Sequence, residues 1–233
     1  MEFLFDVLAD ALRYLADPAG ELGSVVALTL VVAGTATVLG VLAGVPLGVA
    51  LGLWRFPGRG AVLTLVNVGM GMPPVLAGLV LLLLVWGDGP FGGLGLVFTP
   101  AAMILAQTLL AIPIAAGVTA GAVRNLPAAA FEQLAALGLP PLRQGALVGR
   151  EASAGIFAAV AAAFGRVVSE VGAVLIVGGN IKGETRVLTT AIVQEARQAR
   201  FGAALGLGMV LLAIALAVNV VLTRIQLRER PGG

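Results

Sequence analysis

The fold is decided by one stretch near the start of the chain, Ser24 to Trp54, which reads SVVALTLVVAGTATVLGVLAGVPLGVALGLW. It contains no charged residue and is dominated by Val, Leu, Ala and Gly. A helix of about 30 residues rises roughly 45 Å, which exceeds the roughly 30 Å of hydrocarbon in a bilayer. The stretch therefore predicts a transmembrane helix that is tilted or projects beyond the bilayer.

One face of this predicted helix is smooth. Its glycines recur at every fourth residue, at Gly40, Gly44, Gly48 and Gly52. Such a ridge of small residues lets another helix approach closely. The second helix could belong to the same chain or to a second subunit, and we favour packing within the chain.

The composition of the whole chain supports a membrane protein. Hydrophobic residues make up 59% of the 233 residues and charged residues only 11%, whereas soluble domains carry about 25% charged residues. Backbone groups in hydrocarbon must be hydrogen-bonded within helices or closed barrels. Because the apolar runs are long and do not alternate with polar residues, helices are favoured. We therefore expect an all-α membrane protein.

Several classes of site are excluded by residues that the chain lacks. It contains no cysteine and no histidine, which removes disulfides, thiolate metal ligands and the commonest general base. The net charge is only +2 and the basic residues are scattered, so a nucleic-acid-binding surface is not expected. We therefore predict no metal site and no catalytic residues.

The remaining runs complete the predicted architecture. Residues 1–20 form an acidic, amphipathic segment that predicts a helix lying in the membrane interface. Four further spans are predicted at 61–86, 99–123, 146–177 and 201–223. Leu188 to Gln198 predicts a helix that is too short to cross. Residues 21–226 would thus be one transmembrane domain, followed by a tail at 227–233.

Basic residues set the predicted orientation. With alternating spans, one side of the membrane receives a larger share of arginines, namely Arg55, Arg59, Arg124, Arg143, Arg150, Arg224, Arg228 and Arg230. Cytoplasmic loops carry such an excess of basic residues. We therefore expect the N-terminus outside and the C-terminus in the cytoplasm.

A short, non-spanning helix is predicted on the cytoplasmic side, at about residues 126–139. Asn125 suits an N-cap and Pro127 a first turn, while Gly138 suits a left-handed C-terminal residue. Pro140 and Pro141 prevent the helix from continuing. The helix would offer an apolar face to a partner, made of Phe131, Leu134 and Leu137.

Residues 132–138 read EQLAALG, which resembles the cytoplasmic E-A-A-x-x-x-G loop of ABC importer permeases. The spacing from Glu132 to Gly138 matches the family pattern, although Gln133 and Leu134 replace its two alanines. In that family the loop docks into a cleft on the ATPase subunit and transmits its motion. The resemblance implies an ATPase-coupling role for Phe131, Glu132, Gln133, Leu134, Ala135, Leu137 and Gly138.

Other segments are similar to the tungstate-specific permeases, which are relatives of the molybdate and sulfate permeases. The matching segments read GMPPV at 71–75, FTPAAMI at 98–104, SEVGAV at 169–174, VGGNI at 177–181 and LTTAI at 188–192. The resemblance implies a type I ABC importer transmembrane fold with about five spanning helices, placed in a prokaryotic inner membrane.

The same resemblance implies the partners. These are a second copy of the chain, a cytoplasmic ATP-binding subunit, an extracytoplasmic tungstate-binding protein and membrane lipid. The chain has no G-x-x-x-x-G-K-[ST] phosphate loop, so ATP and Mg²⁺ would bind the ATPase and this chain would hold no cofactor.

Two charged residues lie within the fourth predicted span. Arg166 and Glu170 are one helical turn apart, and ionisable groups in lipid should face protein or a water-filled path. Arg166 could offer positive potential to a passing anion. We favour mutual pairing that fixes helix packing, because a partner is available four residues away.

Other candidates for the translocation path are polar residues or helix breakers. Pro73 and Pro74 would break the second span, either to border the substrate path or only to shape packing. Asn180 could form a gate, contact the binding protein or make a turn, and we favour the turn. Gln107 and Thr108 are further lining candidates on the third span.

Three classes of function compete. An ATP-driven oxyanion importer subunit for tungstate is preferred, with molybdate or sulfate as alternative cargo, since tungstate and molybdate are tetrahedral dianions of nearly equal size. An ion-coupled secondary transporter would need mid-membrane carboxylates and often an inverted repeat, but only Glu170 qualifies. An intramembrane enzyme is disfavoured because the chain has few groups that could perform catalysis.

Overall fold

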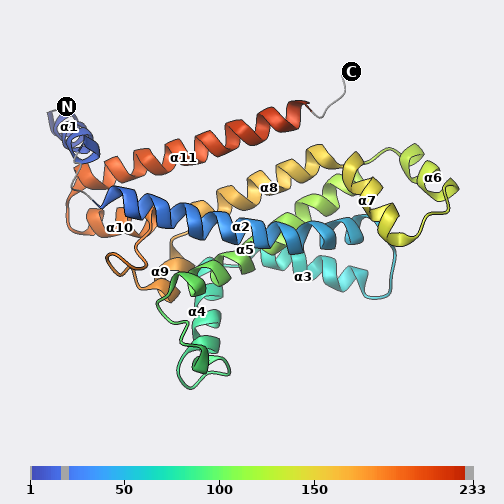
Figure 1. The fold of residues 1–233 in the computed structure, drawn as a ribbon, viewed down its shortest axis with the longest axis horizontal. Helices are drawn as coiled ribbons and strands as arrows, with labels where there is room; N and C mark the ends of the chain where they lie inside the picture. Colours follow the sequence, from blue (N-terminus) through green and yellow to red (C-terminus); the bar gives the residue numbers. More distant parts are fainter. Residues whose placement is uncertain (1, 17–20, 229–233) are drawn as a thin grey trace. The chain divides into compact units, whose positions relative to one another are not determined.

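The computed structural model describes residues 2–16 and 21–228, and every regular element in these ranges is helical (Figure 1). The elements are α1 (Glu2–Ala16), α2 (Leu22–Leu53), α3 (Arg59–Gly71), α4 (Pro74–Val85), η1 (Gly92–Leu94), α5 (Pro100–Arg124), α6 (Ala128–Ala136), α7 (Pro141–Glu151), α8 (Ser153–Val168), α9 (Gly172–Gly178), α10 (Leu188–Arg197) and α11 (Phe201–Arg228). The predicted all-α class is confirmed. Residues 17–20 of the predicted N-terminal segment and 229–233 of the predicted tail lie outside the described residues.

Several helices are long and apolar enough to cross a membrane. Within the described ranges, three single helices meet this description, at Leu22–Leu53, Pro100–Arg124 and Phe201–Gln226. The count rises to five if two interrupted pairs, α3 with α4 and α7 with α8, each form one span. Five spans were predicted, and the three uninterrupted ones lie where the sequence placed them.

The chain divides into two compact units. The first consists of Met1–Ala36, Pro73–Gln107 and Val167–Ala217. In this unit α1 packs against the start of α11, where the Phe3 and Phe201 rings meet edge to face with centroids 6.3 Å apart. α4 packs closely against α9. A Cβ added to Gly78 would lie only 2.7 Å from the Cα of Ala173, so the glycine is what allows this approach.

The second unit consists of Thr37–Met72, Thr108–Arg166 and Val218–Gly233. In it the glycine ridge of α2 lies against α5 of the same chain. A Cβ on Gly44 would lie 2.7 Å from the Ile112 carbonyl oxygen, and a Cβ on Gly48 would lie 2.5 Å from the Ala116 carbonyl oxygen. Gly40 and Gly52 face Ala111 and Val123 in the same way. The ridge therefore brings two backbones together within one chain.

The fourth predicted span, 146–177, is wrong as a single helix. It is divided among α7, α8 and α9, with interruptions at Ala152 and at 169–171. At the second interruption, side chains replace helical hydrogen bonds. The Gln107 amide donates to the Val167 carbonyl at 3.1 Å, and the Thr189 hydroxyl donates to the Glu170 carbonyl at 2.9 Å. These donors stabilise a helix end that the apolar run does not reveal.

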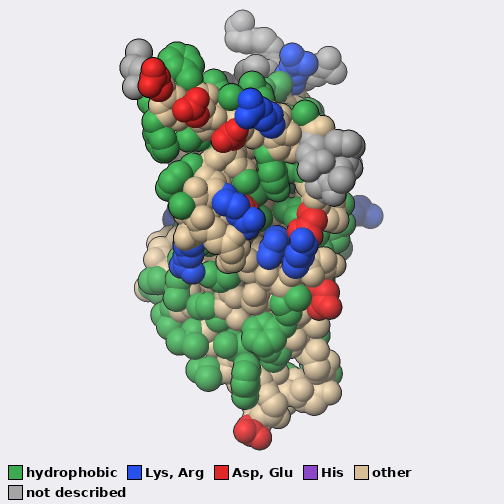
Figure 2. Space-filling model, turned by 90° about the vertical axis from the view of Figure 1, so that its left-hand side faces the viewer, with side chains coloured by type: hydrophobic (Ala, Val, Ile, Leu, Met, Phe, Trp, Pro, Cys, Tyr) green, Lys and Arg blue, Asp and Glu red, His purple; other side chains and the backbone are tan. Residues whose placement is uncertain are grey.

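Charged side chains gather on one face of the first unit (Figure 2). Basic and acidic groups lie beside one another there rather than in separate patches, as in the pair between Arg13 and Asp10 at 3.1 Å. Helix α1 also carries large exposed apolar side chains, including Phe3, Leu4 and Phe5. The observed helix α1 is therefore amphipathic, as predicted, with an apolar stripe that α11 only partly covers.

Candidate functional site

The short predicted cytoplasmic helix is present as α6, and its ends are made by backbone-restricting residues. Pro127 is the residue before the helix, with extended ψ of 146°, and Gly138 follows it with a positive φ of 58°. Pro140 then precedes α7, which begins at Pro141. The prediction that Asn125 caps α6 is wrong, because Asn125 donates its N–H to the Gly121 carbonyl and ends α5 instead.

One leucine anchors α6 to the second unit. Leu134 is only 8% exposed and packs in a cluster of buried side chains formed by Val49, Val123, Val148 and Ala152. The predicted outward face is therefore wrong at this residue. A helix of nine residues has too little apolar surface of its own to stay in place, so its one leucine is needed for attachment.

The other predicted coupling residues lie toward the surface. Leu137 is 60% exposed and Phe131 is half-buried. The side chains or backbone of Glu132, Gln133, Ala135 and Gly138 are exposed. A cavity of about 400 Å³ beside them is lined mainly by apolar groups from the region of α6 and α7, among them Leu126, Phe131, Leu134, Leu137, Leu147 and Val148. The helix therefore presents an exposed edge next to an apolar groove.

The loop after α6 is held by polar contacts. Gln144 of α7 donates its amide to the Leu139 carbonyl at 2.8 Å and accepts from the Trp54 indole N–H at 3.4 Å. Trp54 directly follows α2. The turn after Gly138 is thus connected through Gln144 to the residue that follows α2.

Truncation of Leu134 and of Leu137 should have different effects. We expect Leu134→Ala to lower the thermal unfolding midpoint, because removing a buried leucine side chain costs about 2–5 kcal/mol. Leu137→Ala should leave the midpoint unchanged, since this side chain is mostly exposed. Tryptophan fluorescence during heating in detergent measures both. Equal midpoints in the two variants would contradict the anchoring role.

The charged candidates lie at the break between α8 and α9. Glu170 is 5% exposed and follows the end of α8. The prediction that it shares one continuous helix with Arg166 is therefore wrong. Its carboxylate accepts the Ala173 N–H at 3.1 Å, in the first turn of α9. Arg166 is half-buried in the last turn of α8.

The polar candidates on α5 differ in their surroundings. Gln107 is 4% exposed, and while its amide nitrogen is bonded, its Oε1 is enclosed without a partner among the described residues. Thr108 is half-buried. Gln107 therefore joins Glu170 at the break after α8 rather than facing open space.

The proline pair interrupts the second predicted span as expected. α3 ends at Gly71, and Pro73 precedes α4, which begins at Pro74. The Pro73 carbonyl still accepts from Leu76 and Ala77, at 3.0 and 3.2 Å, so α4 has its first hydrogen bonds. Pro73 is exposed.

Asn180 lies in a turn, in agreement with the preferred interpretation. Its φ is 55°, and the preceding Gly179 also has a positive φ of 71°. The Thr185 hydroxyl closes the loop by donating to the Gly178 carbonyl and accepting the Ile181 N–H. The Asn180 Oδ1 is enclosed and has no partner in the described part of the chain.

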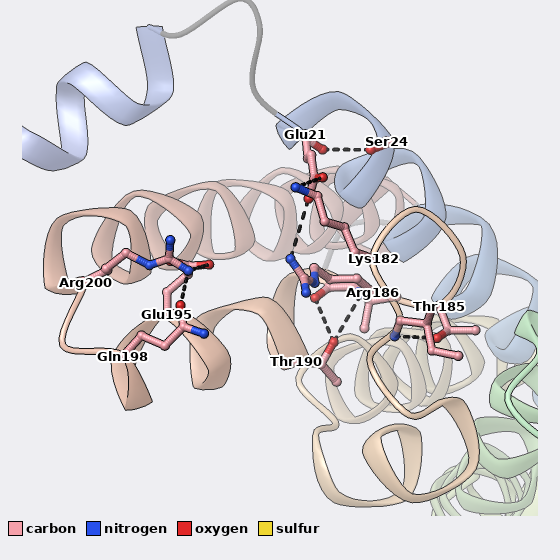
Figure 3. A network of polar contacts seen from close by, with 11 residues as sticks. Glu21, Ser24, Lys182, Thr185, Arg186, Thr190, Glu195, Gln198 and Arg200 are labelled. Carbon is pink, nitrogen blue, oxygen red and sulfur yellow. Dashed lines mark hydrogen bonds and ion pairs between the residues drawn. The ribbon is translucent and has the colours of Figure 1, made fainter.

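Ion pairs in the first unit were not anticipated (Figure 3). Glu21, just before α2, contacts the Lys182 ammonium at 2.6 Å and the Arg186 guanidinium at 3.5 Å. Glu195 contacts Arg200 at 2.6 Å. No sequence signal links Glu21 to residues so distant in the chain. Glu195, near the end of α10, and Arg200, just after that helix, are only five residues apart, and this proximity is visible in the sequence. No cluster of metal-ligating side chains occurs in the ranges 2–16 and 21–228.

Comparison with known proteins gives three findings. A family model described as binding-protein-dependent transport system inner membrane component matches residues 44–231. A probable anion ABC transporter permease protein of Haloferax volcanii is 42% identical over 215 residues, covering 90% of this chain and 92% of the relative. A tungstate uptake system permease protein, TupB of Peptoclostridium acidaminophilum, is 35% identical over 226 residues, covering 97% of this chain and 99% of the relative.

A solved structure has the same fold. A chain of the MetNI methionine ABC transporter, crystallised in inward facing conformations, matches with a TM-score of 0.71 at 22% identity. The match covers 88% of this chain and 94% of that one. The predicted type I ABC importer fold is therefore confirmed.

Proposed function

This chain belongs to the family of binding-protein-dependent transport system inner membrane components, and from that premise we propose that it conducts tungstate into the cell. It is the permease subunit of an ABC importer, a membrane-spanning protein without a catalytic role. The tungstate assignment rests on one observation. The TupB permeases of Peptoclostridium acidaminophilum and Campylobacter jejuni are 35% and 34% identical to 97% of this chain.

We propose that α6 and the turn after it are the contact with a separate ATPase, which holds ATP and Mg²⁺. The exposed positions of Glu132, Gln133, Ala135 and Leu137 support this role, as does the apolar groove beside them. Leu134 would act from the inside, because its burial ties α6 to α2, α5 and α7. Movement of the ATPase cleft would then be passed to the spanning helices.

We propose a homodimer whose two copies enclose the path, with a tungstate-binding protein docking from outside. The N-terminus would lie outside and the C-terminus in the cytoplasm. Much of the apolar surface of this chain needs a covering, since only 11% of the most apolar part of α11 is buried within it. Lipid and a second copy would share that surface.

The path itself is proposed from the residues at helix breaks. Pro73 and Pro74 interrupt one predicted span. At another break, Gln107 bonds the Val167 carbonyl and the Glu170 carbonyl accepts from Thr189. Arg166, Thr108 and Asn180 complete the set of proposed path or gate residues. The enclosed and unbonded Gln107 Oε1 and Asn180 Oδ1 are the positions where a rearrangement would gain hydrogen bonds.

The test is ATP hydrolysis by this chain assembled with its ATPase in liposomes, with a binding protein loaded with different oxyanions. We expect tungstate-loaded protein to stimulate hydrolysis and sulfate-loaded protein not to. Equal stimulation by molybdate would widen the cargo, in line with the more distant similarity to a molybdenum permease, at 30% identity. Stimulation by none of the three would refute the ATP-driven import of these anions and revive an ion-coupled carrier.

A further inference from the structure

Three arginines line one cavity at the predicted cytoplasmic end of the spans, and the proposed transport function assigns them no role. A cavity of about 410 Å³ in the second unit is lined by Arg55, Arg59 and Arg124, together with the aromatic rings of Trp54 and Phe131. Arg55 lies two residues after the end of α2, Arg59 begins α3 and Arg124 ends α5. They therefore lie where spanning helices leave the apolar region.

No acidic side chain among the described residues balances the charge in this cavity. No Asp or Glu lines it, and neither Arg55 nor Arg124 has an ion pair within the described residues. Arg59 uses only its Nε, which donates to the Leu51 carbonyl at 2.8 Å. In the first unit, by contrast, Lys182, Arg186 and Arg200 all have a carboxylate partner.

Three guanidinium groups around one cavity repel each other, and a bound anion would relieve that repulsion. Their planar forks match the oxygens of a phosphate group and bind two of them at once. The aromatic lining also fits one source of phosphate. Tryptophan is enriched at the depth of lipid headgroups, and basic pockets at the cytoplasmic ends of spans hold anionic headgroups.

We propose that Arg55, Arg59 and Arg124 bind the phosphate of an anionic phospholipid, beside the helix that contacts the ATPase. Phe131 belongs to α6, so the lipid would touch that helix directly. A bound headgroup would hold the base of α6 in place. The cytoplasmic position and the effect on α6 rest on the proposed function, but binding of the phosphate group does not.

Lipid binding to the full chain in nanodiscs tests the proposal. Native mass spectrometry counts the retained lipid as phosphatidylglycerol replaces phosphatidylcholine. We expect the wild-type chain to retain phosphatidylglycerol selectively. Each of Arg55→Gln, Arg59→Gln and Arg124→Gln should weaken this binding about fivefold, the contribution of one basic residue near an anionic surface. Gln keeps a donor for the Leu51 carbonyl at position 59.

Matched controls distinguish binding at this cavity from a general attraction between basic residues and anionic lipid. Arg143→Gln and Arg150→Gln remove predicted cytoplasmic charges that do not line the cavity and should leave retention unchanged. A triple Arg→Lys variant keeps the charge and should retain part of the binding. Unfolding midpoints of the Gln variants equal to that of wild type show that these variants fold. Equal retention by the Gln variants and wild type would overturn the proposal.

Two further outcomes would also overturn it. In the first, free phosphate or tungstate at millimolar concentration displaces the lipid, or binds to the chain in discs of phosphatidylcholine alone. Either observation would mean that the ligand is a soluble oxyanion. Loss of lipid when the ATPase binds would make the arginines part of the protein interface. None of these results depends on transport, so a failure of the tungstate assignment would leave the lipid result readable.

Discussion

Replacing Gly138 by Asp is expected to lower uptake of the proposed tungstate cargo sharply, while the assembled ATPase still hydrolyses ATP. Gly138 has a φ of 58°, and a Cβ at this position would meet no atom within 4 Å. Asp is among the few residues that tolerate this conformation, so the turn itself should survive. The new carboxylate would lie at the exposed end of α6, in the proposed contact with the ATPase. An uncompensated charge in such a contact is strongly unfavourable.

We expect uptake into proteoliposomes to fall at least about tenfold, which corresponds to an increase of about 1.4 kcal/mol in the barrier to coupled transport. Uptake and hydrolysis are measured on the same vesicles, so that their ratio reports coupling. The matched control is Gly95→Asp. Gly95 has a φ of 61° and equally open surroundings but lies in the loop before α5. Equal losses of uptake in both variants would mean that backbone strain, and not the contact with the ATPase, causes the loss.

The sequence predicted the ends of α6 and the break at Pro73 better than it predicted the break at 169–171, for physical reasons. Pro73, Pro140 and Gly138 act through their own backbone restrictions, which any neighbouring structure must respect. The break at 169–171 depends on hydrogen bonds from Gln107 and Thr189, which lie far away in the chain. No local pattern indicates such donors, so the apolar run by itself predicts one helix.

The direction in which Leu134 points illustrates a second limit. A short amphipathic helix shows which residues share a face, but the face can pack on its own chain or on a partner. Tertiary contacts decide, and here Val49, Val123 and Val148 occupy the space beneath Leu134. The ion pairs of Glu21 were missed for the same reason, since Lys182 and Arg186 reach it only in the folded chain.

The glycine ridge leads to the other large expected effect. Gly48→Ala should lower the stability of the chain by about 1–3 kcal/mol, the usual cost of forcing extra atoms into a packed contact. A Cβ there would lie 2.5 Å from the Ala116 carbonyl oxygen and 2.6 Å from the Thr119 Cβ. The first contact is with backbone, so α2 and α5 would have to separate. The unfolding midpoint in detergent, followed by tryptophan fluorescence, measures the loss.

Gly34→Ala on the same helix is the matched control, because a Cβ at Gly34 would meet no atom within 4 Å. Alanine is the better helix former by about 1 kcal/mol, so this variant should be as stable as wild type or slightly more stable. The two substitutions are chemically identical and lie in one helix, and only the proximity of α5 distinguishes them. If the stability falls in Gly48→Ala and rises in Gly34→Ala, the difference between the two changes measures the effect of the close approach of α5. A stabilising Gly48→Ala would mean that α2 and α5 lie further apart than described and that the ridge serves some other contact.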